Sequence, residues 1–155
     1  ISRENLELSR EAAAERLGFI SDDRIEKIEN EKSTAHPDEI LAMADAYKNP
    51  SLCNYYCSHE CPIGIKYVPE IKTKELSQIT LEMIATLNRL TRDKDRLIEI
   101  TVDGELSEDE ILDFHKIKMD LEKMSMAIDS LNLWLDNKIA SGKIDPELLK
   151  KVSHE

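Results

Sequence analysis

The residues best suited to chemistry are gathered in one short stretch of the chain. All three cysteines, Cys53, Cys57 and Cys61, lie there, and His59 stands between the last two. Three thiolates and one imidazole form a ligand set that zinc and other transition metals accept. The stretch therefore offers a possible site for zinc or another metal, and apart from this possibility the sequence predicts no cofactor.

The spacing of the cysteines leaves other roles open. On one continuous helix they would share a face but climb about 5–6 Å at each step, which is too far for a common ion. A turn between Cys57 and Cys61, which Ser58 and Pro62 permit, would instead fold His59 and the thiols around one ion. Cysteine is also a frequent core residue, and a pair of thiols can form a redox switch. Packing, metal binding and redox chemistry all remain possible interpretations.

Elsewhere the chain carries no pattern that is typical of catalysis. Its four scattered glycines cannot form a phosphate-binding loop, and no serine lies in a nucleophile elbow. The many carboxylates are spread along helix faces as solvated charge. No apolar run is long enough to span a membrane, and the first residues lack the pattern of a signal peptide. The sequence predicts a cytoplasmic protein that is not an enzyme and has no contact with a membrane.

Two short helices between Ser9 and Lys32 organise the rest of the chain. Ser9 and Ser21 each stand where a helix N-cap is expected, and Gly18 stands where the first helix ends. In the second helix Ile25 and Ile28 lie three residues apart, which predicts that both are buried. An opposite, exposed face would carry Asp22, Asp23, Arg24 and Lys27. Two helices joined by a tight turn are typical of the helix-turn-helix motif.

This stretch resembles the lambda-repressor-like helix-turn-helix regulators of the Xre/Cro type. The matching positions within residues 1–48 are Leu8-Ser9, Ala14, Leu17-Gly18, Ser21, the run Ile25–Asn30, Lys32, Pro37, Leu41 and Ala44. Two features depart from the family pattern. The turn is one residue longer around Phe19-Ile20, and Glu31 stands where the family usually has a glycine.

The resemblance implies a transcriptional regulator that binds double-stranded DNA. In the family's docking mode the second helix of the motif enters the major groove, and its early residues meet base edges. Carried over to this sequence, the resemblance places Asp22, Asp23, Arg24 and Lys27 against bases. It places Ser9, Arg10 and Lys32 against phosphates.

The charge of the chain supports a second hypothesis. The formal net charge is −11, and residues 1–50 contain seven Lys and Arg against twelve Asp and Glu. Affinity for DNA depends on cations that neutralise phosphates, so this balance disfavours DNA as the partner. The alternative function is an acidic protein–protein interaction module, a partner or antagonist of another regulator, that keeps the helix-turn-helix scaffold without binding DNA.

The remaining residues predict an all-α fold with a long antiparallel helical hairpin. We expect a helix-turn-helix domain at 1–50, a cysteine-containing connector at 51–72, the hairpin at 73–140 and a polar tail at 141–155. Apolar residues recur every three or four positions on both sides of Asp103-Gly104, and Ser107–Glu110 reads as a capping box. The apolar seam comprises Leu76, Ile79, Met83, Leu87, Leu90 and Leu97, and then Phe114, Ile117, Leu121, Met124, Ile128, Leu131 and Leu135.

The width of this seam predicts the oligomeric state. Leu133, Trp134 and Ile139 extend it sideways, so that the apolar surface exceeds what one partner helix covers. We therefore expect the hairpin to form a homodimer. Whether the protein binds a small-molecule ligand is left open by the sequence.

Overall fold

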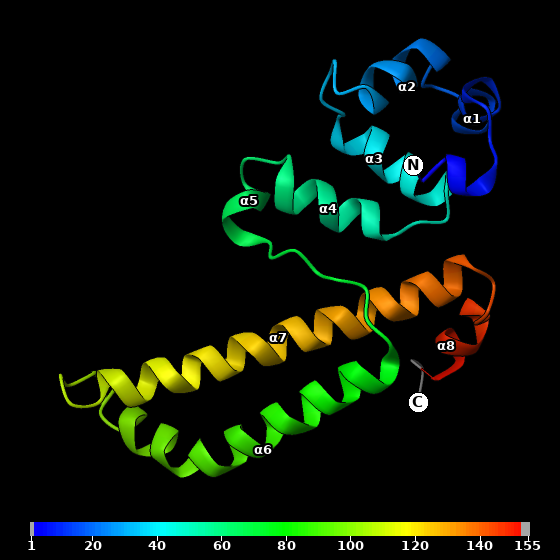
Figure 1. Ribbon diagram of the computed structural model, residues 1–155. Helices are drawn as coiled ribbons and strands as arrows, with labels where there is room; N and C mark the ends of the chain where they lie inside the picture. Colours follow the sequence, from blue (N-terminus) through cyan, green and yellow to red (C-terminus); the bar gives the residue numbers. More distant parts are fainter. Residues whose placement is uncertain (1, 153–155) are drawn as a thin grey trace. The chain divides into compact units, whose positions relative to one another are not determined.

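A computed structural model describes residues 2–152, and every regular element within this range is a helix (Figure 1). The predicted all-α fold class is confirmed. The chain divides into two compact units. The first unit consists of two segments, one that ends at Ile71 and one that begins at Leu135. The second unit is Lys72–Trp134. We describe each unit by itself.

The first unit contains the helix-turn-helix and the helices that follow it. Its elements are the 3-10 helix η1 (Glu4–Leu6), then α1 (Arg10–Leu17), α2 (Asp22–Glu29), α3 (Pro37–Ala46), α4 (Ser51–His59), α5 (Gly64–Tyr67) and α8 (Pro146–Val152).

The expected helix ends are present. The Ser9 hydroxyl accepts a hydrogen bond from the Ala12 amide at 3.1 Å, and the Ser21 hydroxyl accepts one from the Arg24 amide at 3.2 Å. These bonds satisfy amides that have no partner inside the helix. Gly18 ends α1 with a φ of 76°, a conformation that glycine adopts without steric cost. Residue Glu31 has a φ of 56°, which gives a physical reason for the glycine usual at this position.

A compact apolar core joins α1, α2 and α3. Its buried members are Ala13, Leu17, Ile20, Ile25, Met43 and Tyr47. The longer turn supplies one of them, because Ile20 is only 3% exposed whereas Phe19 is 62% exposed. The prediction for the isoleucines of α2 is half right. Ile25 is fully buried, and Ile28 packs against the core only in part.

The segment expected to be a connector contains two helices. α4 packs on α3, and the short α5 folds back on α4. Gly64 makes this return possible. A Cβ atom at Gly64 would lie 2.0 Å from the carbonyl oxygen of Cys57, a distance that no side chain tolerates.

The second unit is built on the predicted hairpin of α6 (Leu76–Thr101) and α7 (Ile111–Ala140), whose last residues belong to the first unit. Three ion pairs fix its register. They join Arg89 to Asp120 at 3.1 Å, Asp93 to Lys116 at 3.9 Å and Arg96 to Asp113 at 2.8 Å. Each step forward along α6 is matched by a step backward along α7, so the helices are antiparallel, as Figure 1 shows.

The contact between α6 and α7 lies to one side of the predicted seam. Buried positions in this part of the hairpin include Ile79, Thr86, Ile100, Ile117, Asp120 and Ala127. Leu87, Leu121 and Ile128, which the seam also included, remain 51%, 48% and 44% exposed. The apolar residues of each helix therefore form two adjacent stripes, and the hairpin buries only one of them. No helix among the described residues is long and apolar enough to span a membrane.

Candidate nucleic-acid interface

The second helix of the motif, α2, is fixed to α3 by a partly buried ion pair. The guanidinium of Arg24 donates from Nε and Nη2 to the two carboxylate oxygens of Glu39, both at 2.7 Å. Nη2 also donates to the carbonyl oxygen of Thr34 at 2.9 Å, and Nη1 donates to the hydroxyl of Ser33. Such two-pronged pairs fix geometry as well as charge.

Glu39 also caps the start of α3. Its carboxylate accepts a hydrogen bond from the His36 amide at 2.7 Å, which closes a capping box. The hydrogen bond from Arg24 is the main cause that lowers the pKa of Glu39 below its ordinary value, and the His36 amide acts in the same direction. One carboxylate thus holds both the start of α3 and the orientation of α2.

The far end of α2 is held by Glu29. Its carboxylate accepts hydrogen bonds from Arg3 at 2.7 and 3.0 Å and from Arg10 at 2.8 Å. The hydrogen bond from Arg3 is the largest of the effects that lower the pKa of Glu29. Because Arg3 is 8% exposed, its charge needs this partner. The ion pair links the segment before α1, α1 itself and α2.

These contacts place the residues predicted to bind DNA. On α2, Asp22, Asp23 and Lys27 are exposed, as expected for an outer face. Arg24 is instead turned toward α3 and is only partly exposed. The sequence argument missed the partner Glu39, although its place three residues after His36, at a helix start with Pro37, is a capping-box signal.

The residues predicted to contact phosphates differ in how free they are. Ser9 uses its hydroxyl to cap α1, and Arg10 is bound to Glu29. Lys32 remains 66% exposed at the side chain and lies 4.0 Å from Glu26. Of the four cations proposed for the interface, Arg10 and Arg24 are held by carboxylates inside the domain, whereas Lys27 and Lys32 are exposed.

The structure spreads out the four residues proposed as metal ligands. Cys53 and Cys57 lie in α4, His59 is its last residue, and Cys61 follows the end of the helix. The His59 ring stacks on Tyr55 with ring centroids 4.3 Å apart, and the Cys61 sulfur accepts a hydrogen bond from the Gly64 amide at 3.5 Å. Among the described residues, no three His, Cys, Asp or Glu side chains come close enough to hold one ion. Metal binding here stays a prediction.

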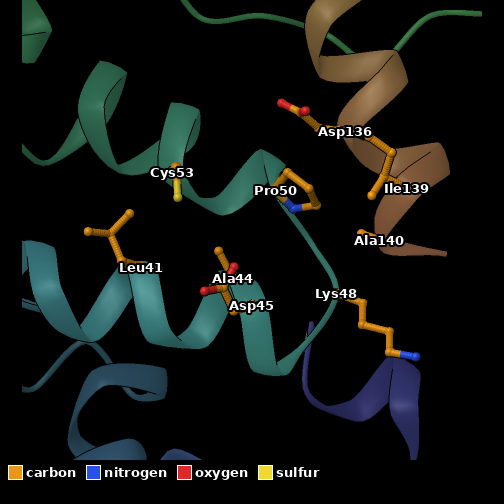
Figure 2. Close-up of a pocket in the computed structure, with 9 residues that line it drawn as sticks. All are labelled: Leu41, Ala44, Asp45, Lys48, Pro50, Cys53, Asp136, Ile139 and Ala140. Carbon is orange, nitrogen blue, oxygen red and sulfur yellow. The ribbon is translucent and has the colours of Figure 1, made fainter. Parts of the chain in front are cut away.

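Cys53 also borders a pocket in the first unit, shown in Figure 2. The cavity has a volume of about 570 Å³ and is lined by Leu41, Ala44, Asp45, Lys48, Pro50, Cys53, Asp136, Ile139 and Ala140. Burial is the main cause that raises the pKa of the Cys53 thiol, and Cys57 and Asp45 add to the effect. Since the thiolate is the reactive form, Cys53 is not an activated nucleophile.

Comparison with known proteins agrees with this geometry over part of the chain. Residues 2–51 match the family model described as helix-turn-helix. No curated protein and no solved structure matches the chain. The matched segment contains α1, α2 and α3 and ends at the start of α4. The match supports the resemblance of residues 2–51 to helix-turn-helix domains of the Xre, lambda-repressor-like type, and it covers about a third of the chain.

Proposed function

We propose that the protein is a transcriptional regulator that binds specific sites on double-stranded DNA as a homodimer. The observation that carries this proposal is the way α2 is held. Its inner side is fixed by Ile25 and by the ion pairs of Arg24 and Glu29, while Asp22, Asp23 and Lys27 face solvent. A rigid helix with polar residues on its free side is what major-groove recognition requires.

The chemistry of the free side suggests how it reads bases. Carboxylates such as Asp22 and Asp23 accept hydrogen bonds from the N4 amino group of cytosine, and Lys27 suits the acceptor edge of guanine. Because Arg10 and Arg24 are engaged inside the domain, Lys27 and Lys32 supply the positive charge at this surface. Two lysines in each of two copies correspond to a salt slope of only about −4.

The hairpin supports the dimer. One of its edges carries the ion pairs between α6 and α7. Apolar residues on the hairpin surface remain about half exposed, namely Ile84, Leu87, Leu121 and Ile128. A second copy related by twofold symmetry would cover such residues and complete a four-helix bundle.

Selection from a pool of random duplexes, followed by fluorescence anisotropy on the enriched sequence, tests the DNA-binding proposal. We expect saturable binding that Lys27→Ala weakens and that a matched change outside the domain, Lys72→Ala, leaves unchanged. Equal effects of the two variants would show that α2 does not form the interface.

The alternative function, an acidic module that binds a basic protein, is favoured by one observation. The exposed side of α2 presents Asp22 and Asp23, whereas Arg24 is not free to offset them. If no duplex is enriched and generic DNA is not bound even at low salt, this alternative replaces DNA binding.

A further inference from the structure

A second cavity opens in the first unit, beside the end of α2. It has a volume of about 450 Å³ and lies between α2, the loop that leads to α3, and α4. Half-buried side chains with apolar surfaces contribute to its lining, namely Ile28, Ala35, Ile40 and Leu52. Exposed residues at its edge include Glu31, Tyr55 and Glu60. The size and apolar lining are those of a small-molecule site.

The charged residues that line this cavity are all acidic. Its lining includes Glu29, Glu31 and Glu60 but no lysine or arginine. Glu29 is neutralised by Arg3 and Arg10. Within the described part of the chain, Glu31 and Glu60 form hydrogen bonds through their backbone amides, and their side chains form neither an ion pair nor a hydrogen bond with another residue. Two carboxylates at the mouth of an apolar cavity are therefore left to solvent.

Aromatic rings complete the edge. Tyr55 and Tyr56 both line the cavity, and the Tyr55 ring is held by stacking on His59. Tyrosine faces attract cations, and this attraction adds to that of nearby carboxylates.

We propose that this cavity binds a small organic cation, a primary amine or guanidine attached to a short apolar body. The apolar body would pack on Ile28, Ile40 and Leu52, and the cationic group would lie between Glu31, Glu60 and the tyrosine rings. Ser33 and Thr34, which bind Arg24, also line the cavity, so the ligand would contact the loop that positions α2. The proposal does not depend on DNA binding.

The probe for this site is 2-phenylethylamine, with 2-phenylethanol as its uncharged counterpart. Amide chemical shifts of the full chain are followed in a titration with each compound. We expect saturable shifts with the amine, concentrated at Ala35, Ile40, Leu52 and Tyr56, and much weaker binding of the alcohol. Glu31→Gln and Glu60→Gln should each weaken amine binding by about two- to fivefold, as expected for partly exposed ion pairs.

The strongly acidic chain attracts any cation, so the control must separate the pocket from net charge. Glu15→Gln removes an exposed carboxylate of α1 and changes the net charge by the same amount. We expect it to leave amine binding unchanged. Equal weakening by Glu15→Gln, equal affinity for amine and alcohol, or shifts scattered over the surface would each overturn the proposal. Unchanged thermal unfolding of each variant shows that its fold is intact.

Discussion

Single residues decide how firmly the helix-turn-helix is packed, and the two isoleucines of α2 provide a test. Ile25 is fully buried between α1 and α3, whereas Ile28 is only partly buried. Truncation of a buried isoleucine removes contacts and leaves a cavity. We expect Ile25→Ala to lower the free energy of unfolding by about 2–5 kcal/mol, measured by chemical denaturation. Ile28→Ala, the matched variant, should cost clearly less, and the opposite order would show that α2 is rotated.

The two carboxylates that anchor α2 make the domain sensitive to acid. Hydrogen bonds from Arg24 and Arg3 lower the folded-state pKa of Glu39 and Glu29 below the ordinary value of 4.5. A lowered pKa stabilises the fold above the unfolded-state pKa, and this contribution is lost as the pH falls through the lower, folded value.

We therefore expect the melting temperature of the domain to fall steeply below about pH 4.5. The variant Glu39→Gln should lower the melting temperature at neutral pH and flatten this acid dependence. Glu15→Gln, at an exposed site, should change neither. An acid profile of Glu39→Gln with the slope of the parent chain would show that the ion pair does not contribute.

For single residues, the spacing along the sequence predicted the helix caps but not the ion-pair partners on other helices. Ser9, Ser21 and Gly18 act within a few residues of their own position, and the sequence identified each of them. The family resemblance predicts that Arg24 faces bases, because it places the early residues of the second helix there. Its partner Glu39 is 15 residues away on the next helix, and only the packing of α2 against α3 brings the two together. The same holds for Arg3 and Glu29, which are 26 residues apart.

Among the elements, the junction of α4 and α5 depends on one glycine. A Cβ atom at position 64 would collide with the carbonyl oxygen of Cys57, which is a backbone atom and cannot rotate away as the end of a side chain could. We expect Gly64→Ala to displace α5 and to speed the reaction of Cys61 with a thiol reagent, because the Gly64 amide would no longer contact its sulfur. Ile65→Ala, at a position 57% exposed in the same helix, is the control and should leave the rate unchanged. Equal rates for the parent and Gly64→Ala would contradict this account.

The elements of the hairpin could be predicted, but their facing sides could not. The turn at Asp103-Gly104 and the capping box of Ser107 and Glu110 could be predicted from the sequence because they depend on interactions between neighbouring residues. The buried face of each helix could not be predicted, because apolar residues cover more than one stripe of each helix. Thr86 and Asp120 are buried in the hairpin in place of the expected Leu87 and Leu121. Asp120 is accommodated there by Arg89 and Lys123, at 3.1 and 2.9 Å.

For the whole molecule, the reason to expect a dimer shifts from Trp134 to the apolar residues that the hairpin leaves exposed. The sequence pointed to Trp134, but this residue is partly buried within the chain. The exposed apolar residues of the hairpin include Ile84, Leu87, Leu121 and Ile128. On neighbouring turns of two antiparallel helices such side chains form an extended apolar strip, which water solvates poorly.

This strip predicts a homodimer that charge can break. Sedimentation velocity at tens of micromolar should give twice the chain mass of 17.8 kDa for the parent protein. The double variant Leu87→Glu with Leu121→Glu should sediment as a monomer, because a dimer would bury four unpaired carboxylates. Leu112→Glu is the matched control, since Leu112 is 79% exposed near the hairpin turn, and it should remain dimeric. A monomeric parent protein would refute the dimer. A dimer that survives the double variant would move the interface away from this strip, whereas loss of DNA affinity together with the dimer would show that two helix-turn-helix domains must bind jointly.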